Sequence, residues 1–181
     1  MDDFDYRDVI EFFKDTFKYI IVIIIVLIVA LYVFTFQQVV GPSMSPTLND
    51  GDVTILNKVV YKLKDPVRNE IVAIKLEAQE KFLIKRIIGL PGEAIEYKNN
   101  ILYINGDGFT EKYLNNVKTN DFSIKKLGYD VIPEDYYLVL GDNRSDSMDS
   151  RDPKVGLIKK SEIVGRVKVQ IWPLKSFKIV K

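Results

Sequence analysis

The chain has 181 residues, and its 26 basic and 25 acidic side chains leave a formal net charge of only +1. This balance gives no electrostatic reason to expect a nucleic-acid partner. Cysteine and histidine are both absent, which excludes disulfides, the Ser-His-Asp triad, Cys–His catalysis and zinc sites built from these side chains. We expect no metal and no cofactor, and any serine nucleophile must use a lysine or a carboxylate as its base.

Residues 1–18 form a mixed-charge arm that precedes a long apolar run. Apolar side chains recur in the arm at roughly helical spacing, which fits either an amphipathic lead-in helix or a short solvated segment. Residues 19–36 contain no charge, and 18 residues is close to the ~20 that a membrane-spanning helix needs. A small-residue cleavage site does not follow the run, so we expect a retained transmembrane anchor rather than a removed leader.

The basic residues near the span predict its orientation. Arg7, Lys14 and Lys18 precede it, whereas the first lysine after it is Lys58. The positive-inside rule then places the arm in the cytoplasm and residues 37–181 on the extracytoplasmic side. Ser43 lies seven positions after Phe36, at most ~25 Å of extended chain, so it must act close to the outer membrane surface.

Beyond residue 48 the sequence changes to short runs rich in β-branched and aromatic residues that end in turns. The expected strands cover residues 53–56, 70–75, 82–88, 93–97, 101–104, 136–140 and 163–171. Residues 98–100 predict a hairpin turn, and the polar residues 107–130 are expected to form an irregular excursion. The whole predicts an all-β domain, a partly closed antiparallel β-barrel or sandwich, behind one N-terminal transmembrane helix.

Two stretches carry candidate chemistry, and the first is the proline-bracketed segment 41–48, GPSMSPTL. Its composition alone favours a linker loop, but it presents Ser43 and Ser45 as possible nucleophiles. A lysine acts as a base at neutral pH only where burial lowers its pKa, by up to ~3–5 units. Lys85, inside the apolar strand 82–88, is the lysine best placed for this, and Lys75 is a weaker rival. The alternative for any strand lysine is a solvated position on the outer face of the sheet.

The second stretch, residues 141–151, has the sequence GDNRSDSMDSR and follows the apolar strand 136–140 directly. Polar side chains at this density can form a local network of Asx turns with an Asp–Arg ion pair. Density alone favours an ordinary surface loop.

Three segments in order resemble the sequence boxes of bacterial type I signal peptidases. They are SMSPT at 43–47, KRIIGLPGE at 85–93 and GDNRSDSMDSR at 141–151. The resemblance extends from the apolar span to Trp172-Pro173, and the single span and small size are similar to those of Gram-positive members. Three boxes in the right order are far more specific than any one of them.

The resemblance implies a Ser–Lys dyad, in which Ser43 is the nucleophile and Lys85 the general base. It also implies supporting roles for further residues that match the motifs: Ser147 hydrogen-bonds and orients the lysine amine, Asp149 and Arg151 form an ion pair, Asp142 and Arg144 are structural, and Met44 shapes the site. The oxyanion would be held by the backbone N–H of Ser43, often aided in this family by a hydroxyl two residues upstream. That position is Gly41 here, so a backbone donor or water must take its place.

The implied function is that of a membrane-bound serine endopeptidase that removes signal peptides from exported preproteins. Its partners would be signal peptides and membrane lipid, with the secretion machinery as a further candidate. A first alternative is a catalytically silent, membrane-tethered β domain that binds exported chains. A second is a self-cleaving Ser–Lys protein of the repressor type, which the membrane span argues against.

Overall fold

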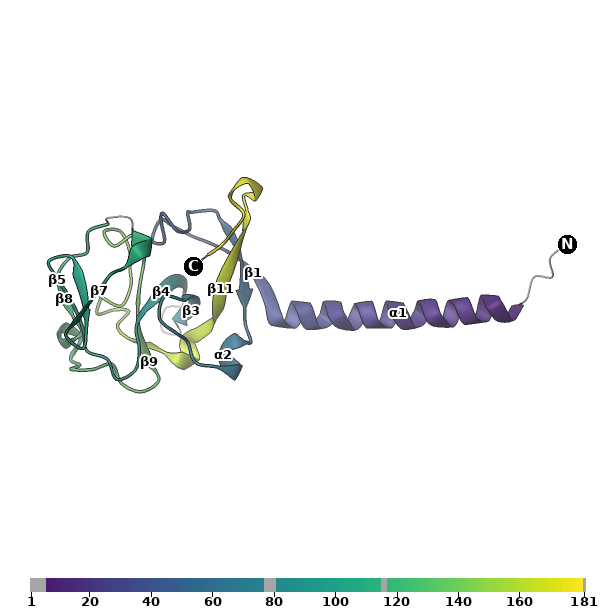
Figure 1. Cartoon of the computed structure of the whole chain (residues 1–181), viewed down its shortest axis with the longest axis horizontal. Coiled ribbons are helices and arrows are strands. Elements are labelled where there is room, and N and C mark those ends of the chain that lie inside the picture. The colour runs from purple at the N-terminus through teal and green to yellow at the C-terminus, as the bar shows by residue number, and fades with distance from the viewer. Residues whose placement is uncertain (1–5, 77–80, 115–116, 181) are drawn as a thin grey trace.

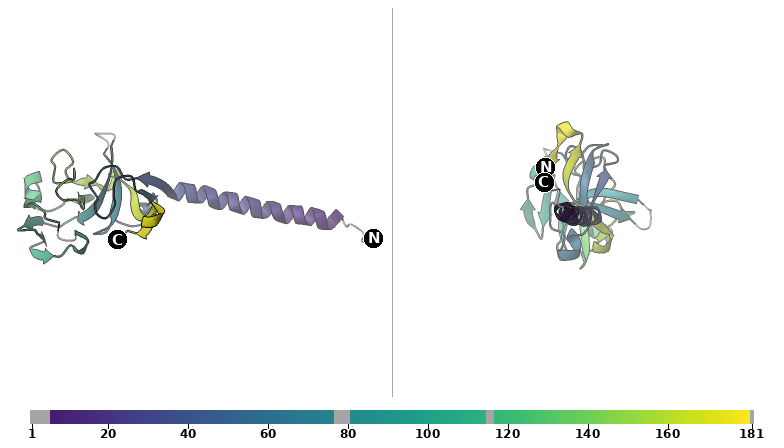
Figure 2. Two further views of the ribbon diagram at one scale, coloured as in Figure 1. Left: turned by 90° about the horizontal axis from the view of Figure 1, so that it is seen from above. Right: turned by 90° about the vertical axis from the view of Figure 1, so that its right-hand side faces the viewer.

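The computed structural model describes residues 6–76, 81–114 and 117–180. One long helix, α1 (Tyr6–Val33), projects from one end of a β domain (Figures 1 and 2). Its segment Ile10–Val33 is long and apolar enough to cross a membrane. The expected lead-in and span are therefore one continuous helix, which ends at Val33 rather than at residue 36 because the chain from Phe34 onwards pairs as a strand.

The main sheet begins with β1 (Phe34–Gln38), which continues directly from α1 and pairs antiparallel with β2 (Val53–Asn57). The order along the sheet is β1-β2-β11-β3-β4-β9-β10, and β12 pairs with β11. The remaining bounds are β3 Ile71–Leu76, β4 Lys81–Gly89, β9 Tyr136–Leu140, β10 Ile158–Lys159, β11 Ile163–Trp172 and β12 Lys178–Ile179. The expected antiparallel β domain is confirmed, but the described strands form no closed barrel, and β1 and β10 are the two ends of the path.

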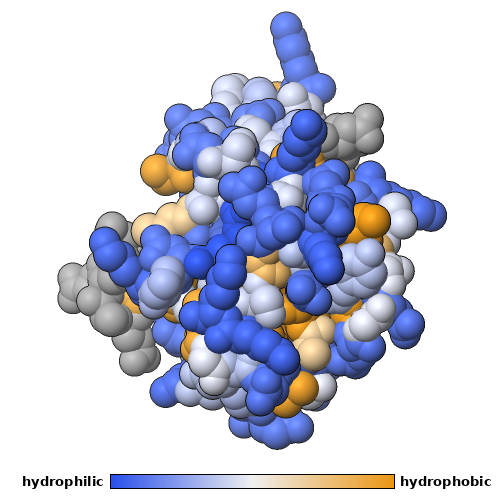
Figure 3. Space-filling view, turned by 90° about the vertical axis from the view of Figure 1, so that its left-hand side faces the viewer, coloured by the Kyte–Doolittle hydropathy of each residue, from blue (hydrophilic) through white to orange (hydrophobic). Residues whose placement is uncertain are grey.

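A second, four-stranded sheet lies at the end of the domain farthest from α1 (Figure 1). Its order is β7 (Asp107–Phe109), β6 (Ile101–Ile104), β5 (Ile95–Lys98) and β8 (Phe122–Ser123). The predicted hairpin joins β5 to β6, and Asn99 and Asn100 adopt positive φ there, as a tight two-residue turn requires. The face of the molecule at this end is mostly hydrophilic (Figure 3).

The prediction of an irregular excursion over residues 107–130 is wrong for part of that range. It contains β7, β8 and two short 3-10 helices, Lys112–Leu114 and Ile124–Leu127, while residues 115–116 lie outside the described residues. Strands of two and three residues are too short to show alternation in a sequence. The other short helices are α2 (Val60–Leu63), Lys160–Glu162 and Leu174–Ser176.

Strand β4 lies at the centre of the packing. The domain has three clusters of buried apolar residues, and β4 supplies one residue to each: Ile84, Ile87 and Ile88. From Ile84 to Ile88 every side chain of the strand is buried. A polar side chain at any of these positions is therefore removed from water, and two cations, Lys85 and Arg86, stand in this stretch.

Candidate active site

The segment that contains Ser43 is a loop between β1 and β2 that is held in place by hydrogen bonds and buried side chains. The backbone N–H of Val39 donates to the Asp52 carbonyl at 2.8 Å, and the N–H of Gly41 donates to the Asp50 carboxylate at 2.7 Å. Met44 and Leu48 are fully buried in the apolar cluster beneath the loop. Ser43, between these anchors, is held half-buried in a fixed position rather than on a free linker.

Ser43 and Lys85 meet at the centre of the site. Lys85 Nζ lies 2.7 Å from Ser43 Oγ, and the same amine donates to the Ile84 carbonyl at 3.1 Å. The sequence left Ser45 open as nucleophile, but its hydroxyl donates instead to Asn49 at 2.8 Å. The rival base Lys75 is exposed on β3, so the structure brings together one serine and one lysine.

The surroundings of Lys85 disfavour its charged form. Only 2% of the residue is exposed, and burial lowers the pKa of the amine from 10.5 to about 8. The charges of Asp149 and Asp142 oppose this effect, whereas Arg151 adds to it. Within the described part of the chain no carboxylate forms an ion pair with Lys85. The neutral amine, which is the form that accepts a proton, is therefore accessible near neutral pH.

Asp142 connects the strand of Lys85 to the loop of Ser43. The guanidinium of Arg86 donates to its two carboxylate oxygens at 2.8 and 2.6 Å, and both side chains are fully buried. The hydroxyl of Thr47, in the Ser43 loop, donates to the same carboxylate. The Arg86 guanidinium also lies over the Tyr113 ring, 4.0 Å from its centroid. Sequence reasoning assigned Asp142 a structural role but did not find Arg86 as its partner.

Asp149 and Arg151 form the ion pair that the motifs implied. Arg151 donates from Nε and Nη2 to the two oxygens of Asp149, both at 2.8 Å, and the Gly141 N–H donates to Asp149 at 3.0 Å. Burial acts to raise the pKa of Asp149, but the hydrogen bonds and charge of Arg151 and the Gly141 N–H outweigh it, so the pKa is lowered. Asp149 is therefore an anion that fixes the start of loop 141–151.

Arg144 connects this loop to the second sheet. Its guanidinium donates to both oxygens of Glu111, to the Tyr97 hydroxyl at 3.0 Å and to the Thr119 hydroxyl at 3.0 Å. The carbonyl of Arg144 accepts a hydrogen bond from Arg151 at 2.8 Å. Glu111 had no signal in the sequence, because a lone glutamate in a polar stretch does not reveal a buried partner 33 residues away.

Gly141 and Ser147 lie close to the backbone of Ser43. A Cβ on Gly141 would stand 2.2 Å from Ser147 Oγ and 2.4 Å from the Ser43 carbonyl oxygen, so a side chain cannot be accommodated without a shift. Ser147 Oγ is buried and has no hydrogen-bond partner among the described residues. The implied hydrogen bond from Ser147 to the Lys85 amine is not formed in this structure, in which the amine lies next to Ser43 Oγ and donates to the Ile84 carbonyl.

A cavity of about 400 Å³ opens beside the dyad. Its walls are residues 37–40 and 82–85, and Met44 and Ala73 also line it. One wall is the outer edge of β1, and the other is the part of β4 that β9 leaves unpaired, since β9 pairs only from Arg86 onwards. In the described ranges no group of acidic, histidine or cysteine side chains is arranged to hold a metal ion.

Comparisons with known proteins identify relatives of this chain. The family model described as "Signal peptidase, peptidase S26" matches residues 10–172. The chain is 40% identical over 156 residues to signal peptidase I of Bacillus caldolyticus, covering 81% of this chain and 84% of the relative. It is also 40% identical over 163 residues to signal peptidase IB of Staphylococcus aureus strain COL, covering 83% of this chain and 84% of the relative.

A solved structure extends the comparison to the fold. The crystal structure of a signal peptidase I from Enterococcus faecalis V583 matches with a TM-score of 0.52 and 38% sequence identity, over 57% of this chain and 97% of that one. These matches define the class of the protein as a peptidase, and therefore a hydrolase. The chain belongs to the signal peptidase family, peptidase S26.

Proposed function

We propose that this chain is a membrane-bound serine endopeptidase that cleaves signal peptides from exported preproteins with a Ser43–Lys85 dyad. One observation carries the proposal: a buried amine, with its pKa lowered to about 8, lies 2.7 Å from a serine hydroxyl at the edge of a cavity. A serine next to a base is the arrangement that nucleophilic catalysis of acyl transfer needs.

In the first half-reaction the neutral Lys85 amine takes the proton of Ser43 as Oγ attacks the carbonyl carbon of the scissile peptide bond. The resulting ammonium gives that proton to the departing amine, and the signal peptide remains as an ester on Ser43. In the second half the neutral amine takes a proton from a water molecule as that water attacks the ester carbon. The ammonium then gives the proton to Ser43 Oγ as the bond from Oγ to the acyl carbon breaks, which releases the acid and restores the neutral amine. Ser147, with its unpartnered hydroxyl beside Ser43, is positioned to orient the amine during these transfers.

The developing oxyanion needs hydrogen-bond donors that are already in place. We assign the backbone N–H of Ser43 as one of them. Gly41 provides no hydroxyl for the second, and its positive φ of 81° disfavours any residue that would. A backbone N–H or a water molecule therefore serves as the second donor.

The cavity supports binding of the substrate as an extended strand. The outer edge of β1 and the unpaired edge of residues 82–85 present free backbone groups on its two sides. A peptide between them would add a strand by β-augmentation. The apolar lining contributed by Ala73 and Met44 suits the small side chains at the −1 and −3 positions of secretory leaders.

We propose that α1 anchors the site at the membrane. The proposed parts are a cytoplasmic arm at residues 1–18, a span at 19–36, of which 34–36 already belong to β1, and an extracytoplasmic catalytic domain at 37–181. Ser43 follows the helix after only a short strand, so it stays near the outer surface where a signal peptide emerges from the bilayer. Contact with membrane lipid follows from the same placement, and the secretion machinery is a further proposed partner.

The test is cleavage in trans of a purified preprotein by the full-length chain in detergent. Replacing the nucleophile (Ser43→Ala) should abolish cleavage, and Lys85→Met, which nearly preserves size, should reduce the rate by about 10²–10⁴-fold. Full processing by either variant would contradict the dyad. If the wild-type chain binds the preprotein without cleaving it, and Ser43→Ala binds it equally well, the result would instead support a silent binding domain.

A further inference from the structure

Two lysines lie against the last turn of the membrane helix. Lys58, which follows β2, donates from Nζ to the carbonyl of Leu31 at 3.3 Å. Lys62, in α2, donates to the hydroxyl of Tyr32 at 3.4 Å, and its ammonium lies 5.6 Å from the centroid of that ring. Chain segments that are 27 and 30 residues apart therefore place two cations where α1 ends.

These contacts do not neutralise the two charges, because a carbonyl and a phenol are both uncharged. Nearby lysines differ: Lys64 pairs with Glu70, and Lys160 pairs with Asp65. Within the described part of the chain, Lys58 and Lys62 form no ion pair with a carboxylate. An anionic group from outside the chain could therefore pair with the two ammonium groups.

The length of α1 fixes the depth at which these cations lie. Its apolar segment Ile10–Val33 has 24 residues, which is ~36 Å of helix at ~1.5 Å per residue, against a hydrocarbon thickness of ~30 Å. The last residues of the helix therefore lie close to the hydrocarbon boundary. Leu31 and Tyr32, and with them the two ammonium groups, lie at the level of the lipid headgroups, where interfacial tyrosine is common.

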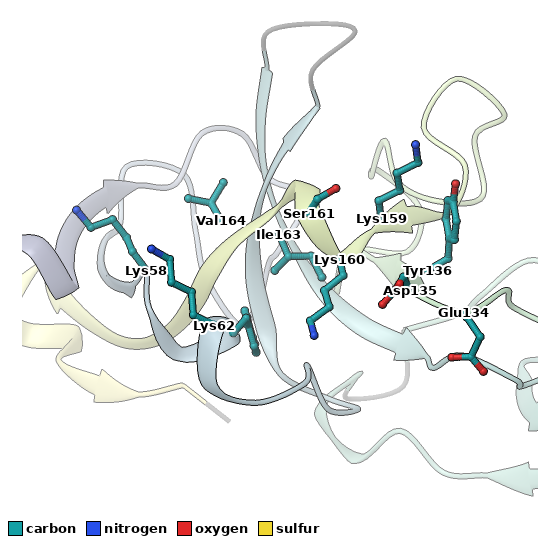
Figure 4. A pocket seen from close by; sticks show the side chains of 11 residues that line it. Lys58, Lys62, Glu134, Asp135, Tyr136, Lys159, Lys160, Ser161, Ile163 and Val164 are labelled. Atoms are coloured by element: carbon teal, nitrogen blue, oxygen red, sulfur yellow. The ribbon is translucent and has the colours of Figure 1, made fainter.

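A cavity of about 690 Å³ lies beside the two lysines (Figure 4). Lys58 and Lys62 occupy its end nearest the junction of α1 with β1, and their side chains extend toward that junction. The acidic lining residues Glu134 and Asp135 stand at the opposite end, and two further lining lysines, Lys159 and Lys160, lie toward that end as well. Among the described residues, Lys58 and Lys62 are therefore the lining lysines that have no acidic lining residue at their own end of the cavity, the end nearest α1.

We propose that Lys58 and Lys62 bind the phosphate of an anionic phospholipid at the point where α1 leaves the membrane. The inference goes beyond the peptidase activity and rests on only one part of the proposed function, the membrane span. A lipid held there would restrain tilting of the domain relative to α1 and so keep the Ser43 cavity at a constant height above the bilayer.

The experiment is native mass spectrometry of the full-length chain in detergent with added phosphatidylglycerol or phosphatidylcholine. Wild type should retain phosphatidylglycerol preferentially. The double variant Lys58→Gln/Lys62→Gln should bind it at least roughly tenfold more weakly, because each lysine near an anionic surface contributes about fivefold. The matched control Lys98→Gln/Lys118→Gln removes the same charge from exposed positions at the far end of the domain and should bind as wild type does.

A further variant and a second readout keep the result interpretable. Lys58→Arg/Lys62→Arg should restore binding because it keeps the charge. Equal binding of the two lipids, equal loss in the control pair, or displacement of the lipid by millimolar inorganic phosphate would each overturn the proposal. Preprotein cleavage measured on the same samples separates the two claims: a chain that cleaves normally but shows no lipid preference contradicts the lipid site and leaves the peptidase standing.

Discussion

The two faces of β4 treat neighbouring cations in opposite ways. Arg86 is fully buried and completely paired, with both oxygens of Asp142 accepting its hydrogen bonds and Tyr113 stacked on its guanidinium. Lys85, one position earlier, is as deeply buried but faces only a hydroxyl and a carbonyl. On one face burial is compensated by a carboxylate, and on the other it is not.

The difference shows how one strand can hold both a structural ion pair and the proposed catalytic base. A buried charge with its partner holds two segments in register, whereas a buried amine without one shifts toward its neutral form. Because both cations lie on β4, the pair Arg86–Asp142 fixes the loop of Ser43, through Thr47, against the strand that carries Lys85. The ion pair thereby helps to set the distance between the Lys85 amine and Ser43.

The largest effect on stability is expected when the buried ion pair Arg86–Asp142 is broken. Asp142→Asn keeps the shape of the side chain but leaves Arg86 buried without its anion, and should lower the free energy of unfolding by about 3–5 kcal/mol. Denaturant unfolding of the full chain in detergent measures this. The control Asp130→Asn disrupts an exposed pair with Lys125 and should leave the transition unchanged. Equal free energies of unfolding for the two variants would show that the buried ion pair contributes no more to stability than the exposed one.

Replacing Lys85, which has no carboxylate partner among the described residues, should raise the free energy of unfolding instead of lowering it. The folded pKa of Lys85, about 8, lies below the ordinary value of 10.5, so the unfolded chain binds the extra proton between these values and stability rises with pH across this window. Near neutral pH the burial of Lys85 therefore lowers the free energy of unfolding by roughly 3 kcal/mol. Lys85→Met should recover part of this stability.

Urea unfolding of wild type and Lys85→Met across this pH window provides the check. The advantage of the variant should shrink as the pH rises from 8 to 10.5. A variant that is less stable at every pH by a constant amount would show that burial does not disfavour the charge on Lys85.

Removing a nearby anion should shift the activity rather than abolish it. Asp149 raises the pKa of Lys85, so Asp149→Asn should move the rising limb of kcat/KM to lower pH. The maximal rate should also fall, because the N–H of Gly141 loses a charged acceptor. The pH–rate profile measures both, and a limb that stays in place or moves to higher pH would contradict the stated electrostatic coupling.

The smallest effect is expected at the exposed rival. Lys75 points to solvent from β3, so Lys75→Met should change the cleavage rate by no more than about twofold, as is usual for surface substitutions. Cleavage of the preprotein is the measurement. A loss comparable to that of Lys85→Met would reassign the base.

The central pair of the site was predictable because its signal is local. A lysine inside an apolar strand is marked by its immediate neighbours, and the motif order pointed to Ser43. The partners Arg86–Asp142 and Arg144–Glu111 were not predictable, because they join residues 56 and 33 positions apart. The first pair depends on the pairing of β4 with β9 in the main sheet, and the second connects loop 141–151 to the second sheet. The role of Gly141 was missed for the same reason, since the space it leaves is defined by Ser43 and Ser147.

The strands that could be predicted were likewise those marked by their own residues and by adjacent turns. Residues 136–140 were found from their continuous apolar composition, and the hairpin at 98–100 was found from its turn chemistry. Strand β1 was hidden, because Phe34–Phe36 continue the apolar composition of the helix and become a strand only by pairing with β2. Tertiary pairing, rather than propensity, ends α1 at Val33.

The most direct test of the account is the ionisation of Lys85 itself. NMR titration of the lysine side-chain resonances in detergent, with Lys85 assigned by its loss in Lys85→Met, reads the pKa without any assay of cleavage. We predict that the Lys85 amine titrates at about 8. If Lys85 keeps its proton up to the ordinary value of 10.5, its amine is not the base and the proposed mechanism is wrong.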